Sequence, residues 1–370
     1  MKNIFLISGL LCWFGQIGFA QKELTLESSI SERYTKFNPE GLNQLSWIKN
    51  ENKWSFVTKD KDPALVSQGA ETLDKKVLIS LGELNTLLEL EKPLPAFPRY
   101  DWLDNKSFTF ISAQKLFSVN FTKKTFKILL EWPAEAKYLE FNAQKTSCAY
   151  IQDDNVFINQ SDGQVAQITK DGGKGIVYGQ SVHRSEFGIT GGIFWSKDGS
   201  KLAFYRMDET MVTDYPLVDI TSVPAKAELI KYPIAGGVSH EVTLGVVNNI
   251  NSAPTYLKID GPKDQYLTSI AWTPDANSLI VGVLNRDQNH LKVNKYGAIS
   301  GELEMALFEE KHDKYVEPEH APWFLPNSQS EFLWFSKRCG FQHLYAYNAE
   351  GDTPRQITRG DWEVHEILGF

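Results

Sequence analysis

The most informative segment of the chain is residues 191–209, GGIFWSKDGSKLAFYRMDE. The aromatic residues Phe194 and Trp195 lead into the polar turn 196–199, and a second apolar run follows at 202–205. Asp-Gly between two such runs is a strong signal for a β-hairpin, because both residues tolerate the backbone conformation of a tight turn. A chain that repeats this pattern folds as a series of β-hairpins.

The pattern returns along the chain with weaker turns. A second pattern ends several of the units. It consists of an alternating apolar strand, an Asx/Gly turn and then Gln-Ile-Thr, and it occurs at 155–169 and 343–358. Looser versions occur at 116–129 and 291–307. Each unit therefore holds four short strands, and four strands in about 40–50 residues is typical of a β-propeller blade. The first aromatic residues of successive units are Trp47, Trp102, Phe141, Trp195, Trp272 and Phe324, and subtraction gives gaps of 55, 39, 54, 77 and 52 residues.

These repeats predict an all-β fold, a propeller with about six four-stranded blades in this chain. The long gap after Trp195 predicts an excursion from one blade at about residues 210–245. Residues 367–370 look like the opening of a further repeat, so we expect the chain to be an N-terminal part of a longer protein. The alternative is a complete set of six blades with a frayed end.

The first twenty residues differ from the rest. Lys2 supplies a positive charge, residues 4–19 are apolar, and Gly18-Phe19-Ala20 has the small residues of a signal-peptidase site. This pattern predicts a signal peptide at 1–20, too short for a membrane span, followed by a mature chain of residues 21–370. We therefore expect a secreted or periplasmic protein. The mature chain keeps Cys148 and Cys339, which we expect to be packing residues rather than a disulfide.

Several function classes are disfavoured. A net charge of −8 argues against nucleic acid as a partner, and no later apolar run is long enough to span a membrane. The closest approach to a serine-hydrolase Gly-x-Ser-x-Gly elbow, residues 237–241, lacks the second glycine and is expected on a hairpin. We expect no catalytic residue, metal or cofactor in this chain. The one polar cluster with metal-ligand residue types is expected to be a solvated loop, with a metal site as the alternative: His312, Asp313, Glu317, Glu319 and His320.

Six segments stand out in order along the chain: 182–189 (VHRSEFGI), 194–209, the expected hairpin 231–246 (KYPIAGGVSHEVTLGV), 285–296, 314–326 and 334–348. Together they resemble the N-terminal β-propeller domain of the dipeptidyl peptidase IV family, in the prolyl oligopeptidase clan, and its secreted bacterial branch in particular. The resemblance implies a propeller of about eight blades over a later α/β-hydrolase domain that carries Ser, Asp and His. That domain is missing from these residues, so the chain should be inactive alone. The family removes dipeptides from free N-termini and prefers Pro or Ala in second position.

The resemblance also suggests a substrate-binding site. In the family, neighbouring glutamates on a blade insertion bind the α-amino group of the substrate. In the matching segment of this chain, Arg184-Ser185-Glu186-Phe187, only Glu186 is acidic. The resemblance thus implies that Glu186 binds the amine, with Ser185 and Arg184 beside it. Arg184 would orient Glu186 or contact a substrate carbonyl. The alternative is that Glu186 is an ordinary glutamate of a surface loop. Glu209 and Asp208 are the second candidate pair of acidic residues for binding the amine, although their position in a strand of alternating pattern favours a structural role.

Two functions follow from these observations. The first is the substrate-gating and N-terminus-binding propeller of a secreted serine dipeptidyl aminopeptidase that releases X-Pro and X-Ala dipeptides. Its partners would be peptides with a free N-terminus and the missing hydrolase domain. A second copy of the chain is a further possible partner, since relatives in the family often dimerise through the propeller excursion. The alternative is a free-standing secreted propeller that binds a partner without catalysis. The insertion at 182–189 favours the first, because a plain scaffold has no need of it.

Overall fold

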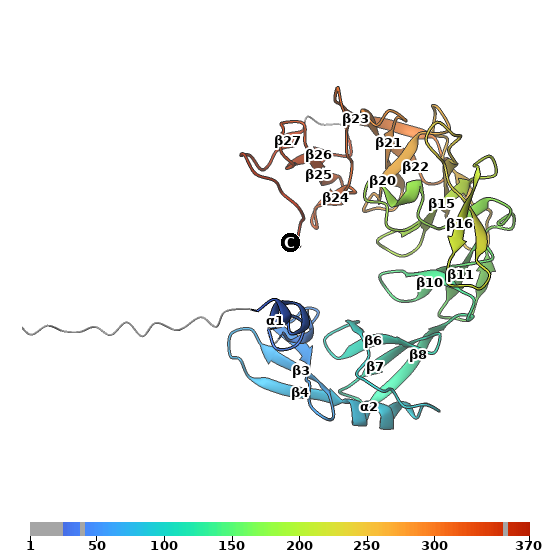
Figure 1. Cartoon of the computed structure of the whole chain (residues 1–370). Helices are drawn as coiled ribbons and strands as arrows, with labels where there is room; N and C mark the ends of the chain where they lie inside the picture. The colour runs from blue at the N-terminus through green and yellow to red at the C-terminus, as the bar shows by residue number, and fades with distance from the viewer. Residues whose placement is uncertain (1–24, 38–40, 351–353) are drawn as a thin grey trace, which may run out of the picture.

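The computed structural model describes residues 25–37, 41–350 and 354–370, so the predicted signal peptide lies outside the described residues. Figure 1 shows antiparallel sheets that follow one another around an open arc, from β1–β4 in blue to β24–β27 in red. We call these sheets blades 1 to 6 in chain order. The predicted all-β propeller architecture with four-stranded blades is confirmed.

Five of the six blades are sheets of four strands paired in sequence order, and blade 4 has five strands. Blade 1 contains β1 (Asn43–Trp47), β2 (Lys53–Val57), β3 (Ala64–Gly69) and β4 (Lys75–Ser80), and blade 2 contains β5 (Tyr100–Trp102), β6 (Ser107–Ser112), β7 (Lys115–Asn120) and β8 (Thr125–Glu131). Blade 3 contains β9 (Lys137–Phe141), β10 (Ser147–Gln152), β11 (Asn155–Gln160) and β12 (Val165–Gln167). Blade 4 contains β13 (Ile176–Tyr178), β14 (Ile193–Trp195), β15 (Leu202–Asp208), β18 (Glu241–Val247) and β19 (Thr255–Tyr256). Blade 5 contains β20 (Tyr266–Trp272), β21 (Ser278–Leu284), β22 (His290–Gly297) and β23 (Leu303–Lys311), and blade 6 contains β24 (Trp323–Phe324), β25 (Glu331–Ser336), β26 (His343–Asn348) and β27 (Arg355–Gln356).

Each aromatic residue that marks a repeat in the sequence is the last residue of a strand, which is the first strand of its blade in every blade except blade 4, where Trp195 ends the second strand, β14. The turn that follows is held by side chains. In blade 4, Asp198 accepts hydrogen bonds from the Ser196 hydroxyl at 2.6 Å and from the Ser200 amide at 3.1 Å, while Gly199 takes a φ of 72° that favours glycine. Asp275 does the same after β20, where it accepts from the Thr273 hydroxyl at 2.6 Å.

The marker tryptophans also join neighbouring blades. The indole N–H of Trp195 donates to the Glu140 carbonyl of β9 at 2.9 Å, and that of Trp272 donates to the Phe194 carbonyl of β14 at 2.9 Å. Apolar faces of adjacent blades meet beside these bonds, as where Val281 and Leu244 belong to one buried cluster. Neighbouring blades therefore share apolar clusters, because each sheet buries its faces against the next.

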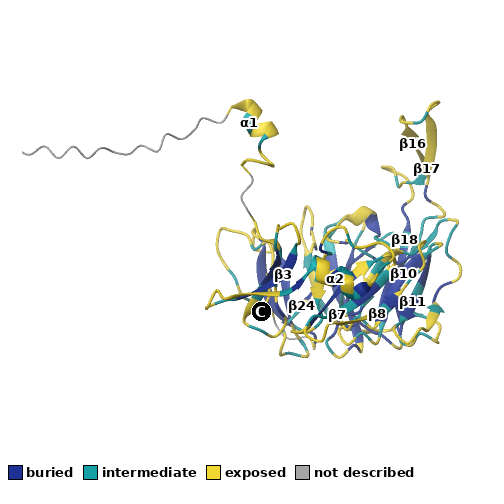
Figure 2. Ribbon diagram, turned by 90° about the horizontal axis from the view of Figure 1, so that it is seen from below, coloured by how far each residue is buried: buried dark blue, intermediate teal, exposed yellow. Residues whose placement is uncertain are grey.

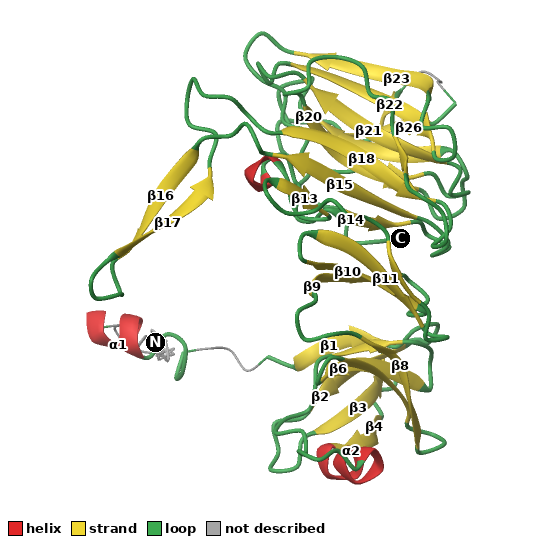
Figure 3. Cartoon of the chain, turned by 90° about the vertical axis from the view of Figure 1, so that its right-hand side faces the viewer, coloured by secondary structure: helices red, strands yellow, loops and turns green. Residues whose placement is uncertain are grey.

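The predicted excursion from blade 4 is confirmed. Strands β16 (Asp214–Asp219) and β17 (Lys226–Lys231) form a two-stranded ribbon that projects from the body in Figures 2 and 3. The prediction of a hairpin at 231–246 is wrong, because β17 pairs with β16 and β18 pairs with β15. Residues 232–240 between them are a loop, which also holds most of the segment 237–241.

Two helices were not predicted from the hairpin pattern: α1 (Leu26–Ser31) and α2 (Leu81–Leu88). Helix α2 begins with a capping box, in which Ser80 accepts from the Glu83 amide at 3.2 Å and Glu83 accepts from the Ser80 amide at 3.1 Å. Its side chains Leu84 and Leu88 are buried in the core of blades 1 and 2. The Ser-x-x-Glu spacing before an apolar run was a signal for this helix in the sequence. Among the described residues, no helix combines the length and the apolar character needed to cross a membrane.

Cys148 and Cys339 are both free thiols. Cys148 is buried in β10, as expected of a packing residue, whereas Cys339 is exposed in the turn between β25 and β26, so the prediction that it is a packing residue is wrong. Residues 367–370 form no strand; the ring of Phe370 lies beside Trp323 of blade 6, with centroids 6.3 Å apart.

Candidate functional site

The segment 182–189 lies in a loop that interrupts the edge of blade 4. Strand β13 pairs with the end of β15, with Tyr178 opposite Arg206, and β14 pairs with its beginning, with Ile193 opposite Phe204. Residues 179–192 leave the sheet between these two strands and form the short 3-10 helix η1 (His183–Ser185), drawn in red near the ribbon in Figure 3. We call residues 179–192 the blade 4 loop. It projects side chains from a rigid sheet, which is a common arrangement for binding residues.

The backbone of the blade 4 loop is strained. His183, Arg184, Ser185 and Phe187 have φ values of 52°, 57°, 62° and 55°, a left-handed region that non-glycine residues rarely adopt. Gly188 has a φ of 69°, and a Cβ there would lie 1.9 Å from the Glu319 carbonyl oxygen of the loop before blade 6. Such strain persists only where surrounding contacts fix the backbone, and it often accompanies a functional site.

Contacts with blade 5 hold this conformation. The Thr268 hydroxyl of β20 donates to the Phe187 carbonyl at 2.8 Å, and the Phe187 ring packs edge-on against Tyr266 with centroids 5.0 Å apart. Within the loop, the Ser181 and Ser185 hydroxyls are 2.8 Å apart, and Ser181 also donates to the Ile189 carbonyl at 3.2 Å. The loop is therefore fixed at both ends and at its tip.

A buried histidine pair lies under the loop. His183 is 3% exposed and His240, just before β18, is 5% exposed, and His183 Nδ1 lies 3.1 Å from His240 Nε2. Burial, helped by the charges of nearby groups, lowers the pKa of His183 to about 3 and that of His240 to about 4. Both imidazoles are therefore neutral at physiological pH.

Glu186 follows η1 and is exposed. Its amide donates to the His183 carbonyl at 3.2 Å and its carbonyl accepts from the Ile189 amide at 3.2 Å, so its backbone is held. Within the part of the chain that the structure describes, its carboxylate has neither a hydrogen-bond partner nor an ion-pair partner. A solvated carboxylate on a fixed backbone can receive a cationic group without first breaking a bond in the protein.

Three of the other predicted residues, Arg184, Ser185 and Glu209, line a cavity of about 320 Å³. Lys231, Ser181 and the histidine pair line it as well. The Arg184 guanidinium carbon lies 4.8 Å above the Tyr232 ring rather than against Glu186. Desolvation raises the pKa of the half-buried Glu209, although Lys231 opposes the shift.

Asp208 does not face this cavity. Its carboxylate accepts from the Thr210 hydroxyl at 2.7 Å and from the Thr210 amide at 3.1 Å, and lies 3.8 Å from Arg206. These contacts cap the turn after β15. The structure therefore brings Arg184, Ser185 and Glu209 to one cavity, with Glu186 on the same loop and Asp208 in a turn.

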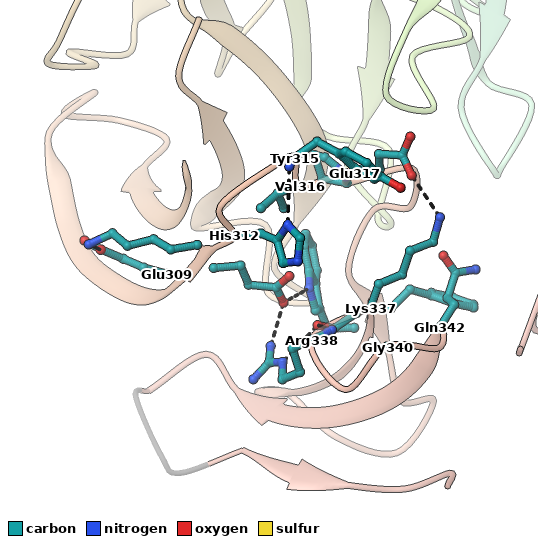
Figure 4. Close-up of a pocket in the computed structure, with 15 residues that line it drawn as sticks. Glu309, His312, Tyr315, Val316, Glu317, Lys337, Arg338, Gly340 and Gln342 are labelled. Carbon is teal, nitrogen blue, oxygen red and sulfur yellow. Dashed lines mark hydrogen bonds and ion pairs between the residues drawn. The ribbon is translucent and has the colours of Figure 1, made fainter. Parts of the chain in front are cut away.

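A second cavity, of about 380 Å³, lies between β23, the following loop and blade 6 (Figure 4). The Glu310 carboxylate accepts from Arg338 at 2.6 Å and from the Trp334 indole at 2.9 Å, and Lys337 pairs with Glu317 at 2.9 Å. These charges already neutralise one another, so this cavity offers no free carboxylate to a substrate amine. The polar cluster at 312–320 borders it as a largely exposed loop, and no group of three or more His, Cys, Asp and Glu in the described residues could hold a metal ion.

Comparison with known proteins agrees with this architecture. The family model described as "Dipeptidyl peptidase IV (DPP IV) N-terminal region" matches residues 104–370. The chain belongs to this family. The match to the DPP IV N-terminal region runs from β6 of blade 2 through blade 6 and includes the blade 4 loop and the ribbon.

The matched relatives are consistent with this assignment. A Phaeosphaeria nodorum protein named "Probable dipeptidyl-aminopeptidase B" is 29% identical over 263 residues, which is 63% of this chain and 29% of the relative. An Emericella nidulans protein named "Probable dipeptidyl peptidase 4" is 24% identical over 350 residues, 88% of this chain and 45% of the relative. The chain therefore spans less than half the length of these curated relatives.

Solved structures share the fold. A Bacteroides ovatus structure described as "a putative dipeptidyl aminopeptidase IV" is 35% identical, covers 90% of this chain and 48% of that one, and gives a TM-score of 0.80. Porphyromonas gingivalis dipeptidyl peptidase 4 is 23% identical, covers 94% and 51% of the two chains, and gives a TM-score of 0.75. At 23% identity, the similarity to the Porphyromonas gingivalis structure shows a shared fold and nothing more.

The sequence did not reveal the histidine pair of this DPP IV propeller. His183 stands inside the segment that carried the resemblance, but His240 is 57 residues away and belongs to another strand connection. No spacing in the sequence indicated that the two would meet. They meet because β13 and β18 flank the same strand, β15.

Proposed function

We propose that this chain is the substrate-gating propeller of a dipeptidyl aminopeptidase and that Glu186 binds the free N-terminus of a peptide substrate. The observation that carries the proposal is the unpaired Glu186 carboxylate on a loop of fixed conformation, in a member of the DPP IV family. A protonated α-amino group is the natural partner of such a carboxylate, since a charge-assisted hydrogen bond contributes about 1.5–3 kcal/mol.

Binding the amine at a fixed position would also select which peptide bond of the substrate reaches the nucleophile. Two extended residues span at most about 7 Å, so an amine fixed that far from a nucleophile presents only the second peptide bond. A blocked N-terminus would leave the carboxylate desolvated without a cation, which is unfavourable. The release of dipeptides, with Pro or Ala in second position, follows from this geometry together with a suitable pocket on the catalytic domain.

Ser185 and Arg184 have supporting roles in the proposal. The Ser185 hydroxyl already meets Ser181, so it shapes the loop rather than replacing a second acid. Arg184 stacks on Tyr232 and directs positive charge toward the cavity, where a substrate carbonyl could accept from it. Glu209 is the nearest second carboxylate that lines the cavity.

The experiment that tests the assignment of the whole protein is sequencing of the reading frame beyond the codon for Phe370. We expect further propeller strands and then a Gly-x-Ser-x-Gly segment with later Asp and His, which would supply the nucleophile and its base. A stop codon directly after Phe370 would overturn the peptidase proposal and favour the free-standing binding propeller.

Glu186→Gln tests the amine site in the intact gene product. The amide keeps the size of the side chain and removes its charge, so we expect KM for an Ala-Pro substrate to rise about 10- to 100-fold with a smaller change in kcat. Glu135→Gln, at an exposed position in the turn before β9, is the matched control and should leave KM unchanged. Equal KM values for both variants would contradict the role of Glu186.

We also propose that the predicted signal peptide directs secretion to the periplasm or the medium. Amino-terminal sequencing of the protein from its native host should then find Gln21 as the first residue. A start at Met1 would contradict the proposal.

Self-association through the ribbon completes the proposal. Leu217, Val218 and Leu229 are 47%, 61% and 64% exposed on a two-stranded sheet that has no further strand beside it. Isolated ribbons of this kind are marginally stable in water, and an apolar exposed surface is typical of a protein interface. We expect sedimentation to show a dimer that Leu217→Glu disrupts; a monomer for the unmodified protein would contradict it.

A further inference from the structure

The histidine pair under the blade 4 loop connects three segments of the molecule. His183 begins η1, His240 precedes β18, and the backbone amide of Leu267 lies in β20 of the next blade. The Leu267 amide donates to His183 Nε2 at 3.2 Å, and the His183 amide lies 3.3 Å from His240 Nε2. One imidazole therefore joins blade 4 to blade 5 directly beneath the loop.

These bonds fix the tautomers of both rings. His183 Nε2 accepts from Leu267, so its proton is on Nδ1, which donates to His240 Nε2. His240 Nε2 therefore carries no proton and its own proton is on Nδ1. A second proton on either Nε2 would point an N–H at another donor, so the arrangement exists only while both rings are neutral.

The charged and titratable groups around the pair also disfavour its protonation. Arg286, after β21, donates to the Tyr266 hydroxyl at 2.7 Å and lies over that ring, whose centroid is 4.9 Å from that of His183. Arg184 and Lys231 add positive charge at the neighbouring cavity, and Glu209 is the carboxylate there. Arg286 lowers the pKa of both histidines, and Arg184 lowers that of His240.

The pair is tied to Glu186 through the backbone. The His183 carbonyl accepts the Glu186 amide at 3.2 Å, and the Val182 carbonyl accepts the Ser185 amide at 3.0 Å. Three consecutive left-handed residues, 183–185, lie between these bonds. A strained turn of this kind relaxes unless its ends are held, so losing the His183 contacts would move the residue that follows it.

We propose that His183 and His240 are positioning residues: as a neutral pair they clamp the blade 4 loop to blade 5 and hold Glu186 where it meets the substrate amine. This proposal rests on the proposed function of Glu186. It predicts that acid releases the loop before the propeller as a whole unfolds, because the pair must break its internal bonds to accept a proton.

Two substitutions of His240 test the clamp. In His240→Gln, the side-chain oxygen can accept the His183 N–H groups but cannot be protonated near neutral pH. In His240→Leu the acceptor is lost at every pH. His290→Gln, at a partly exposed histidine that pairs with Glu309 in blade 5, is the matched control.

The first measurement is KM of the intact gene product for an Ala-Pro substrate between pH 7 and pH 4. Acid affects a peptidase through more than one group, so the informative quantity is the ratio of KM between the parent and His240→Gln. We expect this ratio to be near 1 at pH 7 and to rise about twofold by pH 4, where a group with a pKa of about 4 is half protonated, while His240→Leu has a raised KM at pH 7. A ratio that stays constant with pH would overturn the proposal.

The second measurement is hydrogen exchange of the Glu186 and Ile189 amides, which needs no substrate. We expect exchange to speed up about 10-fold in His240→Leu and to remain slow in His240→Gln and His290→Gln. Unchanged exchange in His240→Leu would overturn the clamp. Faster exchange in His240→Leu, combined with an unchanged KM in Glu186→Gln, would support the clamp and refute the amine site, so the two failures are distinguishable.

Discussion

Strands β15 and β16 follow one another along the chain, separated only by residues 209–213, yet they lie in opposite surroundings. The first four residues of β15, Leu202–Tyr205, are fully buried between blades 3 and 5, whereas all six residues of β16 are exposed. Both strands are completely paired in an antiparallel ladder. Hydrogen bonding between strands is therefore common to both, and packing is what distinguishes them.

The comparison shows which contribution stabilises each region. Phe204 in β15 is 0% exposed and packs against Tyr178, whereas Leu217 in β16 is 47% exposed opposite Glu228. Burial of apolar surface supplies most of the stability of a sheet. The ladder itself contributes little net free energy, because its backbone hydrogen bonds replace hydrogen bonds to water. The ribbon can thus be retained for what it contacts outside the chain, which agrees with its proposed role in self-association.

The largest expected effect is that of Phe204→Ala. Loss of this buried ring should lower the free energy of unfolding by about 3–5 kcal/mol, because a cavity remains between blades 3 and 4. Leu217→Ala in the ribbon should change it by less than about 0.5 kcal/mol. Denaturant titration of both variants measures the difference, and similar values would show that the ribbon is packed in solution.

The next effect concerns pH. Since the pKa of His240 is about 4 in the folded protein and has its ordinary value of 6.5 in the unfolded chain, the unfolded chain binds the extra proton more readily. Stability from this group is complete above about pH 6.5 and is lost as the pH falls toward 4, by about 3 kcal/mol. We expect the free energy of unfolding of His240→Gln to fall less over this range. Equal slopes for the two proteins would contradict the buried, neutral pair.

Gly245→Ala should have an intermediate effect in blade 4. A Cβ at this position of β18 would lie 2.5 Å from the Phe204 ring, so overpacking should cost about 1–3 kcal/mol. Gly191→Ala, where nothing lies within 4 Å, is the control. Combining Gly245→Ala with Phe204→Leu should recover part of the loss in a double-mutant cycle, and strict additivity would show that the two positions do not touch.

The smallest effect on stability is expected for removal of the ribbon. Replacing residues 215–230 by Asn-Gly keeps Asp214 and Lys231, whose side chains pair at 3.0 Å, and closes the gap with a tight turn. The unfolding free energy should change by less than about 1 kcal/mol, while sedimentation shows loss of self-association. A loss of stability as large as that of Phe204→Ala would contradict the contrast between β15 and β16.

Much of the fold was predictable from local sequence. The turn residues Asp198 and Gly199 and the aromatic residue before them specify a hairpin by themselves, and each marker aromatic residue indeed ends a strand that leads into a hairpin. The segment 231–246 was mispredicted, because its Gly-Gly and apolar flanks look like a hairpin although the partners of its strands lie outside it. Helix α2 was not predicted, because the repeat pattern indicates strands with alternating apolar residues and carries no signal for a helix.

The candidate site was predictable only in part. The segment that contains Arg184, Ser185 and Glu186 stood out through its resemblance to a family, and their roles stay predictions. The left-handed run 183–185 could not be foreseen, because none of these residues is the glycine that usually marks such a backbone. The contact of Gly188 with the Glu319 carbonyl depends on a loop more than a hundred residues later in the chain.

The sequence by itself determined the hairpins, their number and the excursion, because a hairpin is specified by alternation and turn residues within about a dozen positions. Only the tertiary structure decided that Trp195 and Trp272 bond to the preceding blade, and that His183, His240 and Leu267 meet beneath Glu186. These contacts join residues far apart in the chain. They depend on how the blades stack around the arc, and the pattern within a single blade does not encode that geometry.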